Sequence, residues 1–288
     1  GTVVDRRKNA YDHTFLVFGL AHAGRVTDNA SLIQAAADAA DVLETRFRDD
    51  HGGLVWLADE DFNDLDEGRS QNPIMHFTEA LLALAEAEGN PARVQQARRW
   101  IDFVFHSCAR DQIPLPEDYD LAWRPTAADG GVRIVLGHQL EWAFLLSHAV
   151  ELGLSADYLA RGHRCLDAGL ELGLDRDRGG LYTIAVPGVG VTIDRKGFWE
   201  QAETIRALWH YTALRGRDTD AGVQEALQKT IAFYRNCLHD PVCGGVYCAI
   251  HADGSPRDTA KGTETKLDYH TAGLCTEVMR LAKRLPSP

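Results

Sequence analysis

The sequence predicts an all-α fold, an (α/α)6-type toroid of helical hairpins with short β-hairpins in its loops. Apolar residues recur at helical spacing along most of the chain, and two kinds of helix alternate. A histidine or a tryptophan also recurs near the start of every second helix, at intervals of 61 to 71 residues. These observations predict one α/α-barrel domain over residues 1–288.

Nine helices are expected from the apolar periodicity, each to within a few residues: 9–26, 30–48, 72–89, 91–110, 134–153, 155–174, 197–215, 218–238 and 268–284. Asn72 and Asn90 are each followed by proline, which predicts an asparagine N-cap with proline in the first turn. Gly89, Gly153 and Gly216 stand where C-terminal glycines are expected.

The two kinds of helix differ in the amount of surface that they are expected to bury. The first kind is aromatic and apolar and is predicted to be inner; the second is charged and amphipathic and is predicted to be outer. Three Gly-Gly pairs, at 52–53, 179–180 and 244–245, each predict a turn into a short strand. Substrate specificity is expected in the long loops 54–71, 112–133, 183–196 and 249–266.

The repeated position near the start of the inner helices is occupied by His13, His76, His138, Trp199 and His270. Equivalent positions in a regular repeat face the same end of the barrel, so we expect these side chains to surround one mouth. Five inner and four outer helices do not close a six-hairpin ring. The ring is therefore open or shorter, or about three N-terminal helices are missing; exposed inner-helix surface would favour a homo-oligomer.

The composition argues against several kinds of partner. The formal net charge of −12 disfavours nucleic acid and anionic membranes, which attract basic surfaces. There is no apolar run long enough to span a membrane and no signal-peptide pattern, so a cytoplasmic protein is predicted. The six cysteines form no CxxC pair and are interpreted as incidental thiols. HExxH is absent, so no metal is predicted.

Two His-Glu pairs are candidates for acid/base chemistry. His76 and Glu79, like His138 and Glu141, are three residues apart and so lie on one face of a helix. A carboxylate in that position can orient an imidazole and raise its basicity. The alternative is that each histidine lies in the core and only forms a hydrogen bond with the neighbouring glutamate. Two His-Glu pairs at the same repeat position, together with His270, favour a catalytic role.

Several other residues are candidates for contacts with a substrate. Aromatic rings could stack on the faces of a sugar or could only pack between helices: Tyr11, Trp142, Trp199 and Tyr269. Arg133 could bind hydroxyls or an enediolate, or could be a surface arginine. Asn72 could contact substrate or act only as an N-cap.

At these residues the chain resembles the N-acylglucosamine 2-epimerase superfamily of sugar isomerases and 2-epimerases. The motifs that carry the resemblance follow the family's order over nearly the whole chain: Tyr11-Asp12-His13, Asn72-Pro73-Ile74-Met75-His76, Gly137-His138-Gln139-Leu140-Glu141-Trp142, Trp199-Glu200-Gln201-Ala202-Glu203 and Tyr269-His270. The third motif is most similar to the isomerase branch. Leu136 stands where the family often has proline, and the family's additional N-terminal helices, with an arginine-bearing strand, have no counterpart.

The resemblance implies a catalytic domain that acts as a metal-independent aldose–ketose isomerase on a free monosaccharide such as mannose or fructose. His138 and His270 would be the acid/base pair that forms a cis-enediolate, and His76 would assist them. Glu141 and Glu203 would orient the histidines. The substrate would be bound by Tyr11, His13, Asn72, Arg133, Trp142, Trp199 and Tyr269. No cofactor is implied, because these steps only transfer protons.

Three alternatives stay open at this point. A sugar 2-epimerase, of the N-acylglucosamine or mannose type, differs only in where the enediolate is reprotonated. A glycoside hydrolase or lyase on the same toroid would need facing carboxylates, for which Asp12, Glu79, Glu141 and Glu203 are candidates. A non-catalytic helical scaffold or binding protein is the third.

Overall fold

A computed structural model of the chain describes residues 2–128, 130–263 and 266–283. Within these ranges all nine predicted helices are present: α1 (Ala10–Thr27), α2 (Ala30–Arg46), α3 (Asn72–Glu88), α4 (Pro91–Asp102), α5 (Leu136–Glu151), α6 (Leu159–Gly173), α7 (Phe198–Leu214), α8 (Ala221–Phe233) and α9 (Tyr269–Ala282). Single π-helical segments extend α4 and α8, over Phe103–Cys108 and Tyr234–Leu238, and a 3-10 turn, Ala156–Tyr158, precedes α6. The predicted end of the last helix, residue 284, lies outside the described residues.

The strands of the described chain have only two or three residues each: β1 (Lys8–Asn9), β2 (Leu57–Ala58), β3 (Arg69–Ser70), β4 (Asp118–Tyr119), β5 (Ala127–Ala128), β6 (Gly131–Val132), β7 (Ile134–Val135), β8 (Ile184–Val186), β9 (Gly190–Val191), β10 (Lys196–Gly197), β11 (Ala249–Ile250) and β12 (Pro256–Asp258). β1 pairs with β2 and β3 pairs with β4, while β7–β8–β9 and β10–β11–β12 form three-stranded sheets, all antiparallel. The predicted short hairpins in the loops are confirmed.

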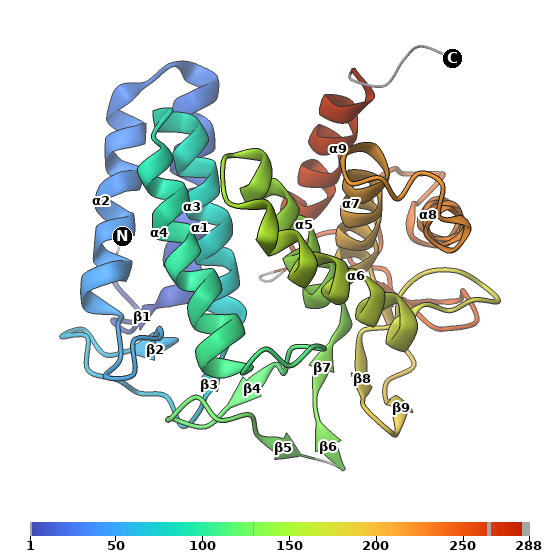
Figure 1. The fold of residues 1–288 in the computed structure, drawn as a ribbon, viewed down its shortest axis with the longest axis horizontal. Helices are drawn as coiled ribbons and strands as arrows, with labels where there is room; N and C mark the ends of the chain where they lie inside the picture. Colours follow the sequence, from blue (N-terminus) through green and yellow to red (C-terminus); the bar gives the residue numbers. More distant parts are fainter. Residues whose placement is uncertain (1, 129, 264–265, 284–288) are drawn as a thin grey trace. The chain divides into compact units, whose positions relative to one another are not determined.

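The chain divides into two compact units. The first unit comprises residues 1–128 and 148–156, and the second comprises residues 129–147 and 157–288. The first contains α1 to α4, in blue to blue-green in Figure 1; the second contains α6 to α9 and most of α5. That residues 1–288 form one catalytic domain stays a prediction.

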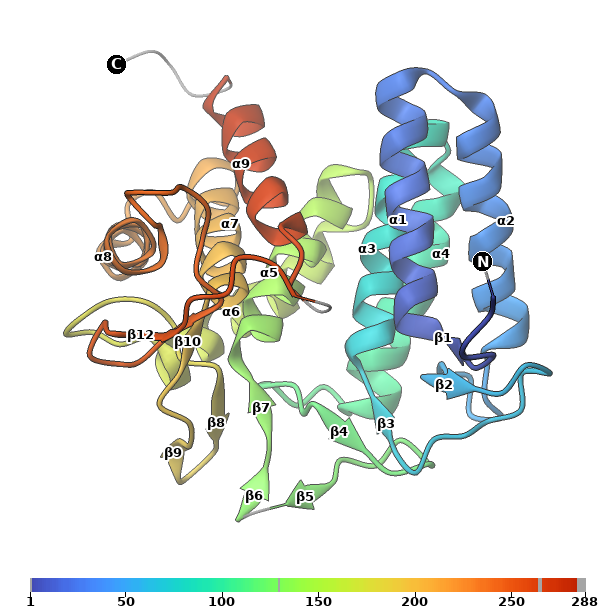
Figure 2. The same cartoon turned by 180° about the vertical axis from the view of Figure 1, so that it is seen from behind.

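Two helical hairpins make up the core of the first unit. In Figures 1 and 2, α1 to α4 lie side by side; α1 contacts α2 and α3, and α3 contacts α4. α3 is buried along almost its whole circumference, as an inner helix should be. α1 buries only one stripe, and Leu16 and Val26 on its other side are 49% and 81% exposed. The alternation of inner and outer helices is therefore clear at α3 and incomplete at α1.

In the second unit α7 is the central helix. It contacts both α8 and α9, and twelve of its seventeen residues are buried. Phe198 at its start packs with Phe233, Leu238, Val246 and Ile250, which come from α8, from the π-helical segment and the turn after it, and from β11. This apolar cluster fixes the beginning of α7, where the candidate site residues lie.

Most of the helix ends follow the predicted capping rules. Asn90 caps α4 by accepting a hydrogen bond from the backbone N–H of Ala92, and Gly89 ends α3 with φ of 62°. The prediction that Asn72 is an N-cap is wrong. α3 begins at Asn72 itself, and Gln71 in the cap position makes no side-chain capping bond. The reason is that Asn72 already belongs to the first turn of the helix, one residue after Gln71, which follows β3.

The three Gly-Gly turns share one anchoring device, which the sequence analysis did not identify. Asp49, Asp175 and Asp240 each accept backbone N–H groups of the turn that follows. Each also binds a cationic side chain further along the chain, namely Arg69, Lys196 and Lys261. Directly after each glycine pair the chain forms an isolated bridge, and the strand itself begins three or four residues later.

Candidate functional site

The indole of Trp199 contacts two imidazoles in the second unit. Its ring centroid is 5.2 Å from that of His138 and 5.5 Å from that of His270. The three residues occupy the first turns of α5, α7 and α9, and β7 and β10 run directly into the first two of these helices. The structure therefore brings together three of the predicted site residues through the starts of three helices.

A glycine allows this close approach. A Cβ atom at position 137 would lie 2.5 Å from Cζ3 of Trp199 and 3.0 Å from Cγ of Glu200. Any other residue before His138 would therefore push the indole away from the histidine. Gly137 was part of a predicted motif, and the structure supplies the physical reason for it.

His270 is held by a buried carboxylate. Its Nδ1 lies 2.8 Å from Oε1 of Glu203, which is completely buried on α7. An ionised carboxylate only accepts hydrogen bonds, so the geometry places a proton on Nδ1. Nε2 of His270 makes no hydrogen bond to the described residues, so its lone pair is available to a ligand. This is the geometry that orients an imidazole for proton transfer.

Glu203 also binds a second partner that the sequence analysis missed. Nη1 of Arg206 lies 3.3 and 3.2 Å from the two carboxylate oxygens. The guanidinium carbon lies 3.7 Å from the ring centroid of Phe144, a cation–π contact. The i, i+3 spacing of Glu203 and Arg206 is the signal that could have revealed the pair, because the same spacing identified the two His-Glu pairs.

Glu141 lies beside this arrangement. It is completely buried and accepts a hydrogen bond from the hydroxyl of Tyr269 at 3.2 Å. Atoms of Glu141, Glu203 and His270 lie within 4.8 Å of one another, close enough for these residues to hold a metal ion together. Arg206 already supplies a positive charge to Glu203, and this disfavours a second cation at the same place.

Glu200 is a further acid that the sequence analysis did not place in the site. It is completely buried, and neither carboxylate oxygen meets hydrogen-bond geometry with a described residue. Burial raises its pKa, while Arg195 and the Thr183 hydroxyl oppose that shift only in part. A Cβ atom at Gly197 would collide with its carboxylate, so the chain leaves space for this acid.

In the first unit, His76 is surrounded by aromatic rings of α1. Nδ1 of His76 lies 3.4 Å from Oε2 of Glu79, as the spacing predicted, and both residues are almost completely buried. The centroids of Tyr11 and Phe15 lie 5.1 and 4.8 Å from that of His76. Trp56 stacks on Tyr11 at 5.8 Å with an interplanar angle of 15°.

His13 is not part of this cluster. Its Nδ1 donates to the backbone oxygen of Asn9 at 3.0 Å, and its ring packs on Phe47 at the end of α2. On α1 it is Tyr11, two residues earlier, whose side chain contacts His76. Two residues on a helix differ by about 200° in direction, so Tyr11 and His13 face different neighbours.

The remaining predicted residues lie in different environments. Trp142 is completely buried, which favours packing over contact with a sugar. Arg133 is half-buried between β6 and β7. Oδ1 of Asn72 is buried and accepts no hydrogen bond from the described residues. An unsatisfied buried acceptor is costly, so Asn72 stays a candidate for binding a hydroxyl.

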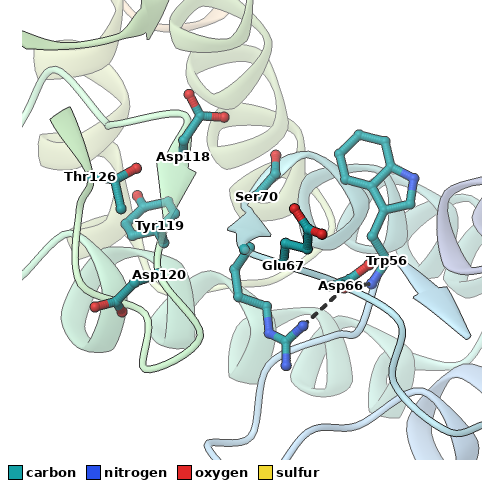
Figure 3. A pocket seen from close by; sticks show the side chains of 10 residues that line it. Trp56, Asp66, Glu67, Ser70, Asp118, Tyr119, Asp120 and Thr126 are labelled. Carbon is teal, nitrogen blue, oxygen red and sulfur yellow. Dashed lines mark hydrogen bonds and ion pairs between the residues drawn. The ribbon is translucent and has the colours of Figure 1, made fainter. Parts of the chain in front are cut away.

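A pocket of about 460 Å³ lies in the first unit. It is bounded by the segment 66–70, by the turn 118–126 and by Trp56 (Figure 3). Its lining includes the carboxylates of Asp66, Glu67, Asp118 and Asp120. Two of the loops in which specificity was predicted, 54–71 and 112–133, form it, although residue 129 of the second lies outside the described residues.

The chain is similar to several known proteins. The chain is 25% identical to a D-mannose isomerase of Marinomonas mediterranea over 97% of this chain and 73% of that protein. It is 32% identical to a D-mannose isomerase of Thermobifida fusca over 72% of this chain, and it spans only 54% of that protein's length. A crystal structure of a D-mannose isomerase superposes with a TM-score of 0.86 at 26% identity, covering 97% of this chain and 73% of that one.

These likenesses confirm the predicted all-α fold class of the α/α-toroid type and the predicted class of sugar isomerase or epimerase. No helix in the described ranges is long and apolar enough to cross a membrane. The sequence also matches the N-acylglucosamine 2-epimerase (GlcNAc 2-epimerase) family over residues 1–274, which carry all the motifs that first indicated it. With this match over nearly the whole chain, the protein belongs to the N-acylglucosamine 2-epimerase family.

Proposed function

We propose that the chain is a metal-independent aldose–ketose isomerase that acts on a free monosaccharide such as mannose or fructose. The observation that carries the proposal is the contact of Trp199 with both His138 and His270, with His270 oriented by buried Glu203. An indole offers a face for a sugar ring, and two imidazoles beside it can donate and accept protons.

The mechanism needs only groups of the chain itself. After ring opening, the unprotonated Nε2 of one histidine removes the proton from C2, and the electron pair moves to the carbonyl oxygen as the cis-enediolate forms. The other histidine supplies a proton to that oxygen and then removes the proton of the hydroxyl on C2. As the C2 carbonyl forms, the first histidine returns its proton to C1 and the product is the ketose. Arg133 offers positive charge to the developing oxyanion. His76, oriented by Glu79, assists at ring opening.

Trp56, which stacks on Tyr11, also lines the pocket of the first unit, together with Asp66, Glu67 and Asp118. Carboxylates accept hydrogen bonds from sugar hydroxyls, although Asp66 is already paired with Arg69 in the same lining. The relatives named D-mannose isomerase support mannose as the first sugar to test.

The test is proton NMR of the full chain in D2O with mannose and, separately, fructose, glucose and N-acetylmannosamine. Loss of the C2 proton signal together with ketose formation would support the isomerase. Exchange at C2 that gives only the epimer would assign the 2-epimerase alternative. Absence of exchange with all four sugars would contradict the proposal, and sugar binding without exchange would favour a binding protein.

A further inference from the structure

We propose that Arg206 is a positioning residue that pairs with the carboxylate of Glu203 and, through its positive charge, keeps His270 a neutral base. The inference rests on the proposed role of His270 in proton transfer. Arg206 acts on Glu203, which in turn acts on His270.

The three side chains form a continuous buried chain. Arg206 is 8% exposed and Glu203 is completely buried. Oε1 of Glu203 lies 2.8 Å from Nδ1 of His270 and 3.3 Å from Nη1 of Arg206. Phe144 covers the guanidinium at 3.7 Å and limits its access to water. Charges in such a place interact strongly, because little water screens them.

A carboxylate alone would favour the imidazolium form of its histidine partner. Arg206 changes this balance, because the guanidinium shares the negative charge of Glu203 and would repel a positive charge on His270. The neutral ring then keeps its proton on Nδ1, toward Glu203, and leaves Nε2 with a lone pair. A base that abstracts a proton from carbon needs that lone pair.

The other charged groups around His270 increase the need for a cation. Glu141 on α5 lies within 4.8 Å, and Glu200 on α7 is near enough for the two groups to affect each other's charge. Tyr269 packs on the His270 ring at 4.0 Å. The ammonium of Lys266 lies over the ring of Phe198 and is already bound by Asp268. The charge of Arg195 acts on Glu200, whose pKa it lowers against the effect of burial. Among these groups Arg206 is the cation bound to Glu203 itself.

The same side chains occur a second time in the unit and provide a matched control. Glu277 and Arg280 on α9 hold His210 on α7, with 3.2 Å from Nε2 of His210 to Glu277 and 2.5 Å from Arg280 to Glu277. His210 is completely buried, and its other nitrogen lies 2.8 Å from the Ser147 hydroxyl. Its two ring nitrogens are therefore both engaged, unlike those of His270.

The experiment measures kcat/KM against pH for the full chain, with the sugar whose exchange is fastest by NMR. Arg206→Gln removes the charge but keeps a donor for Glu203, Arg206→Lys keeps the charge, and Arg280→Gln is the control. The acidic limb should move to higher pH by about one unit in Arg206→Gln, a tenfold change in proton affinity. It should stay at the wild-type position in Arg206→Lys and in Arg280→Gln.

An acidic limb that does not move, or moves to lower pH, in folded Arg206→Gln overturns the inference. Equal shifts in Arg206→Lys or in Arg280→Gln also overturn it. If circular dichroism shows that Arg206→Gln is unfolded, the test rests on Arg206→Lys. An acidic limb displaced by about one pH unit in that variant refutes the role of the charge. A wild-type chain without any exchange contradicts the proposed function, whereas an active wild type with an unchanged Arg206→Gln profile contradicts only this inference.

Discussion

Replacing Gly137 by alanine tests whether the packing of α5 against Trp199 sets the geometry of the site. The new Cβ would lie 2.5 and 2.6 Å from two carbons of the indole and 3.0 Å from Cγ of Glu200. Unstrained carbon contacts are about 3.5–4.0 Å, so the ring must move by about 1 Å. The first turn of α5, which carries His138, and the indole would both be displaced.

The magnitude follows from two opposing effects. Overpacking a full site costs about 1–3 kcal/mol, while exchanging glycine for alanine in a helix interior gains about 0.5–1 kcal/mol. Gly137 is in the first turn of α5, where that gain is smallest, so we expect a net loss of about 1–2 kcal/mol in the free energy of unfolding. A displacement of about 1 Å near the chemistry should also lower kcat/KM at least about tenfold.

Gly19 in α1 is the matched control, because it is exposed and a Cβ atom added there would meet no other atom within 4 Å. Gly19→Ala should raise the free energy of unfolding by about 0.5–1 kcal/mol. Urea denaturation followed by circular dichroism measures both variants, and NMR exchange measures their activity. If Gly137→Ala is stabilised like Gly19→Ala and keeps kcat/KM within about twofold of wild type, the packing argument is refuted.

Three further predictions concern the site and the network behind it. His138→Ala and His270→Ala should each abolish C2 exchange while far-UV circular dichroism stays unchanged; full activity in both would exclude them as the acid/base pair. Incubation with EDTA should leave the exchange rate unchanged, since the proposed steps are proton transfers; a loss that zinc restores would contradict a metal-independent reaction. Although burial alone would raise the pKa of Glu277, hydrogen bonds from His210 and Arg280 lower it from 4.5 to about 2. The free energy of unfolding that this shift supplies is therefore complete above pH 4.5 and is lost as the pH falls toward 2. The loss should be about 2–3 kcal/mol after allowance for partial screening. The free energy of unfolding of Glu277→Gln should depend less on pH in the same range.

The helices could be predicted from the sequence because their apolar periodicity and their glycine and asparagine signals act locally. Asn90 and Gly89 show this directly, since each forms the predicted cap with a neighbour only a few residues away. The contacts of α1 could not be predicted in the same way. Its residues are apolar on nearly every side, so the sequence does not indicate whether Tyr11 or His13 faces α3.

The site was predicted where it depends on positions within a helix and missed where it depends on packing between helices or on loop conformation. His76 and Glu79 meet because of their spacing alone. The partner of Glu203 is His270, 67 residues away, and only the packing of α9 on α7 brings them together. The pocket beside Trp56 is formed by two loops, whose backbone conformations have no periodic signal to reveal them.

The two histidine networks on α7 and α9 show why residue types alone do not identify the reactive group. Each contains a histidine, a glutamate and an arginine three residues beyond the glutamate. His210 binds Glu277 and the Ser147 hydroxyl and is completely buried, so no substrate atom can reach either nitrogen. His270 binds only Glu203 through Nδ1 and presents its ring to Trp199, with Nε2 making no hydrogen bond to the described residues. The same pattern therefore stabilises the packing of α7 on α9 at one place and can support proton transfer at the other, and the difference is the accessible nitrogen beside an aromatic surface.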